Sequence, residues 1–269
     1  MLPGTIFSDD YKRLIKVDER ENGTFEIPSG VEVIEMQAFR DCTRISEIII
    51  PVSLKRIQTN AFGGCTLIEN VTYKGPLVQW FNILFASRRS HPCSYGASLK
   101  TADFGNDPIR HLNVPSSAVQ IPSFAFCGCR IETVKIPANI KRIGIEAFSH
   151  CNWLAKVEID EGLHTIDMNA FSCSGLRSIN LPNSLKQLSL AAFERTSLRH
   201  LYLPRSLEVV GAHLLIEGHP EAEFFCEGIP GEKWTEGWNK IKWKARTARA
   251  KTHLNVPRWW YELNVVSKT

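Results

Sequence analysis

The sequence predicts an α/β protein that is mostly β and is built as a solenoid of short stacked coils. A motif that ends in Ala-Phe recurs at a fixed spacing, and apolar residues alternate with polar ones just before a recurring proline. The composition agrees with a packed core, because 43% of the 269 residues are hydrophobic and 22% are charged. No run of about 18 apolar residues occurs, so we expect no membrane-spanning helix.

The repeat is anchored by phenylalanines that follow one another at steps of 22 or 23 residues, with one step of 64. They are Phe39, Phe62, Phe126, Phe148, Phe171 and Phe193, and Leu214-Leu215 fills the Ala-Phe slot of a seventh, degenerate copy. Eleven residues before the anchor stands a proline (Pro28, Pro51, Pro115, Pro137, Pro182, Pro204) or, once, Asp160. A period of about 22 residues lies in the leucine-rich range of solenoids, whose coils bury their apolar faces only against neighbouring coils.

Each unit is expected to contain two extended pieces and a turn. Apolar residues alternate in Val134–Ile136 and Ile179–Leu181, as they do in a half-buried strand. The following proline cannot donate to a ladder and ends the strand at a corner. A second extended piece such as Ile140–Ile143 directs its end residues inward, and Ala-Phe then turns the chain with the Phe buried.

The segment 65–109 is irregular, and we expect it to hold about two degenerate coils rather than a separate domain. A short helix is expected around 77–84, with Trp80 packed on the edge of a coil. The alternative is that this segment forms a binding bulge.

Segments outside the repeats are expected to close the stack, because a solenoid needs capped ends. We expect an N-terminal cap over residues 1–24, a solenoid over 25–223, a closing segment over 224–239 and a basic aromatic tail over 240–269. In the cap, Phe7, Tyr11, Leu14 and Ile15 are expected to cover the first coil. The aromatic run 259–261 is expected to dock on the last coil or on a second copy of the chain.

The repeat units 27–42 and 134–151, with their spaced Ile-Pro, Ala-Phe and Cys, resemble those of the bacterial surface-antigen (BspA-type) leucine-rich repeat family. The resemblance extends over roughly residues 25–239, including the variant coil around Trp80 and the closing segment from Phe225. It implies a right-handed solenoid with a parallel sheet on its concave side and short helical turns. It also implies a role in protein binding and in adhesion at the bacterial cell surface.

The location that this family implies is the cell surface or the medium. The first residues lack the charged start and long apolar run of a secretory signal, so a cytoplasmic location stays open as the alternative.

The cysteines are expected to pack and not to bind a metal. Most of them follow the repeat Phe by two or three residues and form one column (Cys42, Cys65, Cys129, Cys151, Cys173). A buried cysteine behaves as a small apolar residue. The sequence 127–129 resembles half of a zinc site but lacks a second ligand pair at zinc spacing, and Cys93 and Cys226, outside the column, are expected to be exposed.

The sequence predicts neither catalysis nor a cofactor. Phosphate-binding, dinucleotide-binding, nucleophile-elbow and metalloprotease motifs are missing, and the histidines are scattered. We therefore expect a non-catalytic protein.

The outward positions of the concave strands are the expected contact surface, with another protein as the partner and a glycan as the alternative. These candidates are His111, Asn113, Thr133, Lys135, Lys156, Glu158, Ser178, Asn180, His200 and Tyr202. They are polar, and nucleic acid would require a denser basic stripe.

Residues 240–258 carry seven basic side chains and no acidic one. The alternative function is therefore a cytoplasmic scaffold or a nucleic-acid-associated protein that uses this tail. The tail can also act only as a solubilising segment. The candidate tail contacts are Lys242, Lys244, Arg246, Arg249, Lys251, Trp259 and Trp260.

Overall fold

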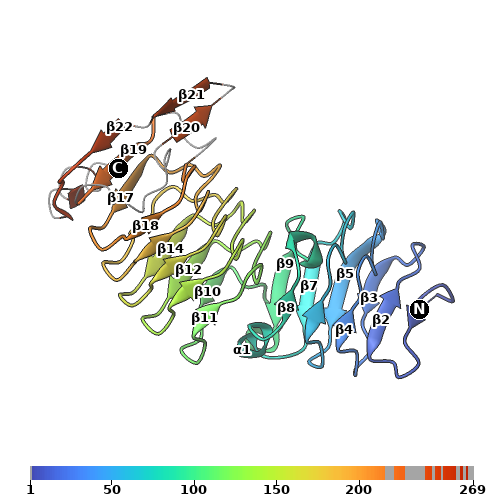
Figure 1. Ribbon diagram of the computed structural model, residues 1–269. Helices are drawn as coiled ribbons and strands as arrows, with labels where there is room; N and C mark the ends of the chain where they lie inside the picture. The colour runs from blue at the N-terminus through green and yellow to red at the C-terminus, as the bar shows by residue number, and fades with distance from the viewer. Residues whose placement is uncertain are drawn as a thin grey trace. The chain divides into compact units, whose positions relative to one another are not determined.

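The computed structural model describes residues 2–215, 221–227, 240–243, 246–249, 251–258, 261–262 and 265, with the backbone alone for 240–243 and 246–249. The chain divides into two compact units, Met1–His111 with Pro122–Ile131, and Leu112–Ile121 with Glu132–Thr269. Both units stack short parallel strands as a β-solenoid, which confirms the predicted mostly-β fold (Figure 1).

The first unit contains two sheets in which strands follow coil after coil. The longer strands, β3 (Gly23–Glu26), β5 (Ile45–Ile50), β7 (Asn70–Tyr73) and β9 (Ser98–Thr101), pair in parallel in that order. The shorter strands are β2 (Arg13–Lys16), β4 (Val33–Ile34), β6 (Arg56–Ile57) and β8 (Leu84–Phe85). β1 (Ile6–Phe7) pairs antiparallel with β2, so a hairpin forms the first edge of the short-strand sheet.

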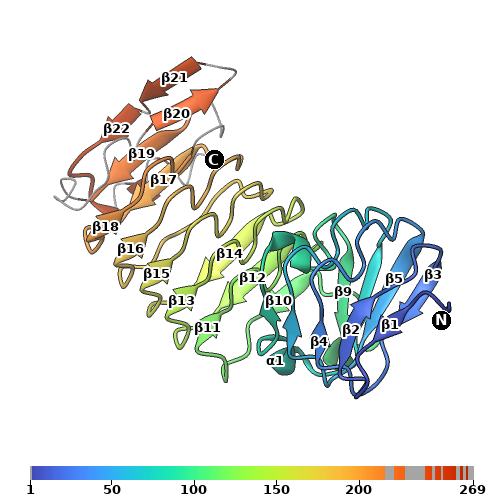
Figure 2. The same ribbon diagram turned by 45° about the vertical axis from the view of Figure 1, so that its right-hand side comes forward.

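The second unit repeats this arrangement (Figure 2). Its long strands form two sheets. The first contains β10 (His111–Asn113), β12 (Thr133–Ile136) and β14 (Lys156–Ile159). The second contains β17 (His200–Leu203), β19 (Glu223–Cys226) and β22 (Lys251–His253). Its short strands are β11 (Gln120–Ile121), β13 (Arg142–Ile143), β15 (Thr165–Ile166), β16 (Gln187–Leu188) and β18 (Val209–Val210). β20 (Lys240–Trp243) and β21 (Arg246–Arg249) form an antiparallel pair.

The repeat phenylalanines form the core of the turns, as predicted. All six are fully buried. The rings of Phe39 and Phe62 stack with centroids 4.5 Å apart, and those of Phe148 and Phe171 with centroids 5.4 Å apart. The backbone N–H of Phe148 also donates to the carbonyl of Ala170 in the next coil at 2.8 Å. The corners at Phe39, Phe148 and Phe171 each join their coil to the next by a ring contact and a hydrogen bond.

The corners depend on left-handed backbone at two positions that the sequence pattern does not mark. Residues two before and two after the repeat Phe have positive φ, as at Glu146 (51°) and His150 (59°). Their N–H groups donate, like that of Phe148, to the next coil. The three acceptors are the carbonyls of Met168, Ala170 and Ser172, at 3.1, 2.8 and 2.8 Å. The unfavourable conformation is retained because it directs alternate N–H groups at the neighbouring coil.

The irregular middle continues the solenoid. The helix α1 (Leu77–Trp80) is shorter than the predicted 77–84, because Leu84 and Phe85 join the short-strand sheet as β8. Trp80 is fully buried, and its Nε1 donates to the carbonyl of Ala125 at 2.8 Å, which confirms the packing interpretation of this residue. Two 3-10 turns, Arg88–Ser90 and Ala102–Phe104, complete the segment.

Two sequence expectations about cysteines are wrong. Cys93 and Cys226 are buried instead of exposed. Cys226 ends β19 opposite Leu203, so its side chain points into the core, and burial raises the pKa of its thiol to about 12. Cys93 lies in a turn that the loop at Gly128 covers, since a Cβ atom on Gly128 would come within 2.2 Å of the Cys93 carbonyl oxygen.

The expectation of a strand at Ile179–Leu181 is also wrong. Ile179 and Leu181 are buried as in a strand, but the segment between β14 and β17 forms no regular ladder. Proline in the repeat slot does not account for this, because β3 and β5 pair although Pro28 and Pro51 follow them.

The described part of the C-terminal segment docks on the last coils, as expected for this segment. β22 pairs in parallel with β19, and Lys251 and His253 both bond to Glu223. Tyr261 packs against Tyr202 with ring centroids 5.0 Å apart. The Tyr202 hydroxyl donates to the carbonyl of Val256 at 3.1 Å.

Phe148→Ala should lower the free energy of unfolding by about 3–5 kcal/mol, because it removes a fully buried ring from the stack. Urea denaturation measures the change. Trp153→Ala is the control, since Trp153 is 61% exposed and its loss should cost about 0.5 kcal/mol or less. Equal effects of the two substitutions would contradict the buried-Phe core.

Asn169→Val should destabilise the protein by about 1–2 kcal/mol, because a β-branched residue is poorly tolerated at a φ of 57°. Asn169→Gly should change stability by less than about 1 kcal/mol, since glycine adopts this conformation without strain. Thermal and urea denaturation of both variants check this pair, and a ranking with Val more stable than Gly would refute it.

Tyr261→Ala should loosen the C-terminal segment by removing a buried ring that contacts Tyr202 and Phe225. Tryptic cleavage after Lys251 and Arg258 should then accelerate by at least about tenfold. The control is Leu254→Ala in the same segment, where the side chain is 46% exposed and cleavage should keep its wild-type rate. Identical cleavage of both variants would argue against docking.

Candidate functional site

The long-strand face of the second unit is the outward side of its long strands, and it carries most of the sequence-predicted contacts. Six of the ten candidates are exposed on this unit: Asn113, Lys135, Lys156, Glu158, Ser178 and Asn180. His111, which is also exposed, is the last residue of the first segment of the first unit. Thr133 and His200 are half-buried. Side chains from several successive coils therefore share one face, although they lie far apart in the sequence.

The register of β12 and β14 aligns these residues in rows. Thr133 lies opposite Lys156, and Lys135 lies opposite Glu158. The alternating residues Val134 and Val157 are buried, which holds the polar rows outward. Lys156 and Glu158 form an ion pair at 2.6 Å, and the hydrogen bond from Lys156 holds the pKa of Glu158 below its usual value.

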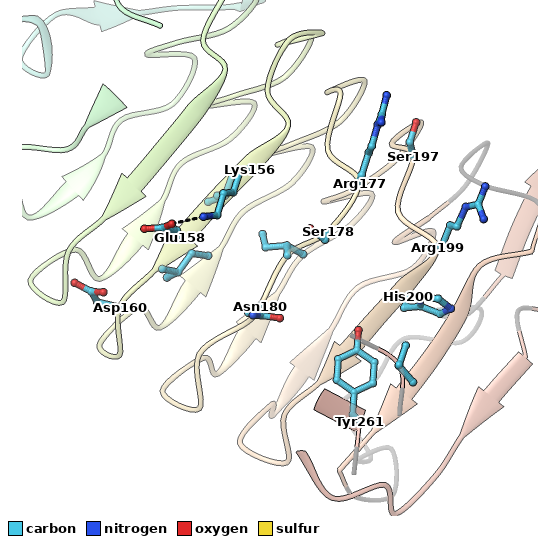
Figure 3. Close-up of a pocket in the computed structure, with 14 residues that line it drawn as sticks. Lys156, Glu158, Asp160, Arg177, Ser178, Asn180, Ser197, Arg199, His200 and Tyr261 are labelled. Atoms are coloured by element: carbon cyan, nitrogen blue, oxygen red, sulfur yellow. Dashed lines mark ion pairs between the residues drawn. The ribbon is translucent and has the colours of Figure 1, made fainter. Parts of the chain in front are cut away.

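A groove of about 960 Å³ crosses this face where the ladder is interrupted (Figure 3). Its sides come from β14, the segment 177–180 and residues 197–200, and Tyr261 and Val265 of the C-terminal segment line it as well. The groove lies where segment 176–181 forms no regular ladder with its neighbours.

Charges of both signs line the groove. Lys156, Arg177 and Arg199 stand where their extended segments begin, whereas Asp160 follows the end of β14, as Figure 3 shows. Between these ends lie hydroxyl and amide groups of Ser178 and Asn180. This arrangement can form ion pairs and hydrogen bonds with a ligand that itself carries both charges and polar groups.

The sequence pattern missed part of this lining. Arg177, Ser197 and Arg199 lie just before the predicted outward columns, and Asp160 occupies the proline slot.

The expectation that Tyr202 is exposed on this face is wrong. Tyr202 is 2% exposed, because Tyr261 and Phe225 pack on it and the Arg258 guanidinium lies 5.1 Å from its ring centroid. Arg258 also donates to the carbonyl of Leu181, the acceptor that Pro204 cannot use. Burial raises the pKa of Tyr261 to about 12, so its hydroxyl stays neutral at physiological pH.

The candidate tail contacts are placed only in part. Lys251 is exposed and pairs with Glu223 at 3.1 Å. The backbones of Lys242, Arg246 and Arg249 lie in the β20–β21 pair, where Lys242 is opposite Thr247 and Arg249 is opposite Lys240. Lys244, Trp259 and Trp260 lie outside the described residues.

Within the described ranges, the helices are all too short and too polar to cross a bilayer.

Comparison with known proteins places the repeats in one family. The profile described as "BspA type Leucine rich repeat region (6 copies)" matches residues 20–92 and 97–216. No curated protein sequence matches the chain significantly.

Solved structures share the fold. A leucine-rich repeat protein from Eubacterium ventriosum superposes with a TM-score of 0.52 at 21% identity, covering 76% of this chain and 50% of its own. One from Bacteroides ovatus gives 0.51 at 21% identity, covering 82% and 51%. This chain spans about half the length of these two proteins. With the repeat profile matching most of the sequence, the chain belongs to the BspA-type leucine-rich repeat family.

Proposed function

We propose that the chain is a non-catalytic binding protein that recognises another protein through the long-strand face of its second unit. The observation that carries the proposal is the continuous set of exposed polar side chains from Asn113 to Asn180, which ends in the groove beside β14. The family to which the chain belongs is built of repeats that generally serve protein interaction.

The charges favour a protein over the other candidate ligands. Glu158 pairs with Lys156 and Asp160 lines the same groove, and a nucleic acid would be repelled by these carboxylates. A glycan is less well served, because Tyr202, the aromatic ring among the ten candidates, is covered by the C-terminal segment and cannot stack on a sugar. Within protein binding, we propose adhesion at the cell surface as the role, which the family resemblance supports.

The rows on β12 and β14 are suited to recognition because buried neighbours hold them in place. Binding to these rows orders little further backbone, and the partner's own charges decide the fit. The groove adds a concave element to this face.

The test begins with a photo-reactive residue at Ser178, in the groove, and a second one at Lys186 as a control on the short-strand side. Both are exposed. Crosslinking on intact source cells or neighbouring cells should capture a protein from position 178 and little from position 186. Equal capture at both positions would reject this face as the binding surface.

Against the partner so identified, Lys156→Glu should weaken binding by about tenfold or more, because it reverses a charge at the groove. Lys186→Glu should leave the dissociation constant unchanged. Titration calorimetry measures both, and unchanged affinity for Lys156→Glu would contradict the proposal.

A further inference from the structure

Three side chains that can bind a metal meet inside the first unit. His91, Cys93 and Cys129 each offer one ligand atom, and the three atoms lie within 4.8 Å of one another. Their side chains are buried, with exposures of 0%, 0% and 1%. The irregular coil supplies the first two, and the Phe126 repeat supplies the third.

The histidine is oriented by its hydrogen bonds. Its Nε2 lies 3.0 Å from the carbonyl oxygen of Ala125, and because a carbonyl can only accept, Nε2 carries the proton. Nδ1 therefore keeps its lone pair and accepts the Cys93 N–H at 3.0 Å. Metal-bound histidines have this arrangement, in which one nitrogen is anchored to a carbonyl and the other faces the ion.

The backbone holds the two cysteine segments against each other. Gly128 has a φ of 74° and is so close to Cys93 that any side chain at Gly128 would collide with the Cys93 carbonyl. The same Ala125 carbonyl that accepts from His91 also accepts from Trp80 Nε1 at 2.8 Å. The His91 ring packs on Phe85 with centroids 4.6 Å apart, so the surroundings are apolar and rigid.

We propose that His91, Cys93 and Cys129 form a zinc site, with Nδ1 and the two sulfur atoms as ligands. Zinc takes two thiolates and one imidazole as a donor set and leaves its fourth position to a water molecule. Zn–S bonds of about 2.3 Å and Zn–N bonds of about 2.0–2.1 Å place tetrahedral ligand atoms roughly 3.5–3.8 Å from one another. The three atoms already lie within 4.8 Å of one another, so the approach that zinc requires is at most about an ångström. The ion displaces the Cys93 amide from Nδ1, and the adjacent thiolates are the acceptors left to that amide.

Charge balance favours a divalent ion here. Two thiolates and a neutral imidazole cancel the charge of Zn²⁺, so the buried site carries no net charge. Binding releases two thiol protons to the solvent per ion. A disulfide between the cysteines is the competing possibility, and it needs a two-electron oxidant such as a peroxide or a small disulfide.

Zinc at this place would join the irregular coil to the repeat that follows it. Because the ligands meet only in the folded chain, the ion stabilises the first unit and not the unfolded state. The family repeats elsewhere in the chain hold their coils without it.

The experiment uses the full chain, stripped of metal under reducing conditions, with Zn²⁺ alone as the probe. The wild type should bind one more equivalent of zinc than Cys129→Ala, and should release about two protons with it. Zinc at about 100 times its dissociation constant should raise the Tm by at least about 5 °C. Cys42→Ala is the matched control, because Cys42 is equally buried and follows Phe39 as Cys129 follows Phe126.

Equal zinc binding by the wild type and Cys129→Ala would overturn the proposal. If Cys129→Ala fails to fold, the number of protons that the wild type releases on binding zinc tests the proposal instead. Zinc binding by the wild type without proton release would reject coordination by thiolates. A Cys93–Cys129 disulfide in the protein isolated without reductant would assign the pair to redox chemistry instead.

Discussion

The stacking of successive Ala-Phe corners is the contact on which the rest of the structure depends. The stacked repeat rings Phe148 and Phe171 exclude water from the turns, and the Phe148 N–H is bonded to the carbonyl of the next coil. A single coil cannot bury its own apolar side, so each one is stable only because its neighbours complete the core. The strands on either side of the corner then follow at fixed steps, and their outward residues are held in rows. Alanine is suited to the corner because its small side chain lets the next coil approach, and its carbonyl accepts the bond.

The groove beside β14 is a departure from this regularity. Where a residue with an N–H follows the strand, as Asp160 does, the ladder to the preceding coil is complete. The segment 176–181 forms no regular ladder with its neighbours, and the groove lies there. The carbonyl of Leu181 in this segment accepts a hydrogen bond from Arg258. This bond helps to anchor the C-terminal segment that borders the groove.

The segments outside the regular repeats are bound to the solenoid by polar groups of single side chains. In the C-terminal segment, the carbonyl of Val256 accepts from the Tyr202 hydroxyl. Lys251 and His253 of the same segment bond to Glu223. Trp80 and His91 tie the irregular coil to Ala125 of the following repeat. In each case an aromatic ring supplies buried area and a hydrogen bond supplies direction. This explains why sequence periodicity fades in these segments while parallel strand pairing continues through β9 and β22.

The sequence by itself determined the stack of coils, the burial of the repeat phenylalanines and the outward direction of residues such as Lys135 and Glu158, because periodicity records which side of the chain faces the core. Only the tertiary structure decided the rest. Glu146 and His150 have positive φ because their N–H groups donate to the next coil, and this requirement does not select one residue type. The burial of Tyr202 results from a segment more than fifty residues later, and the meeting of His91 with Cys129 results from coil packing. Contacts between distant segments leave no period in the sequence, and these contacts set the extent of the exposed polar face.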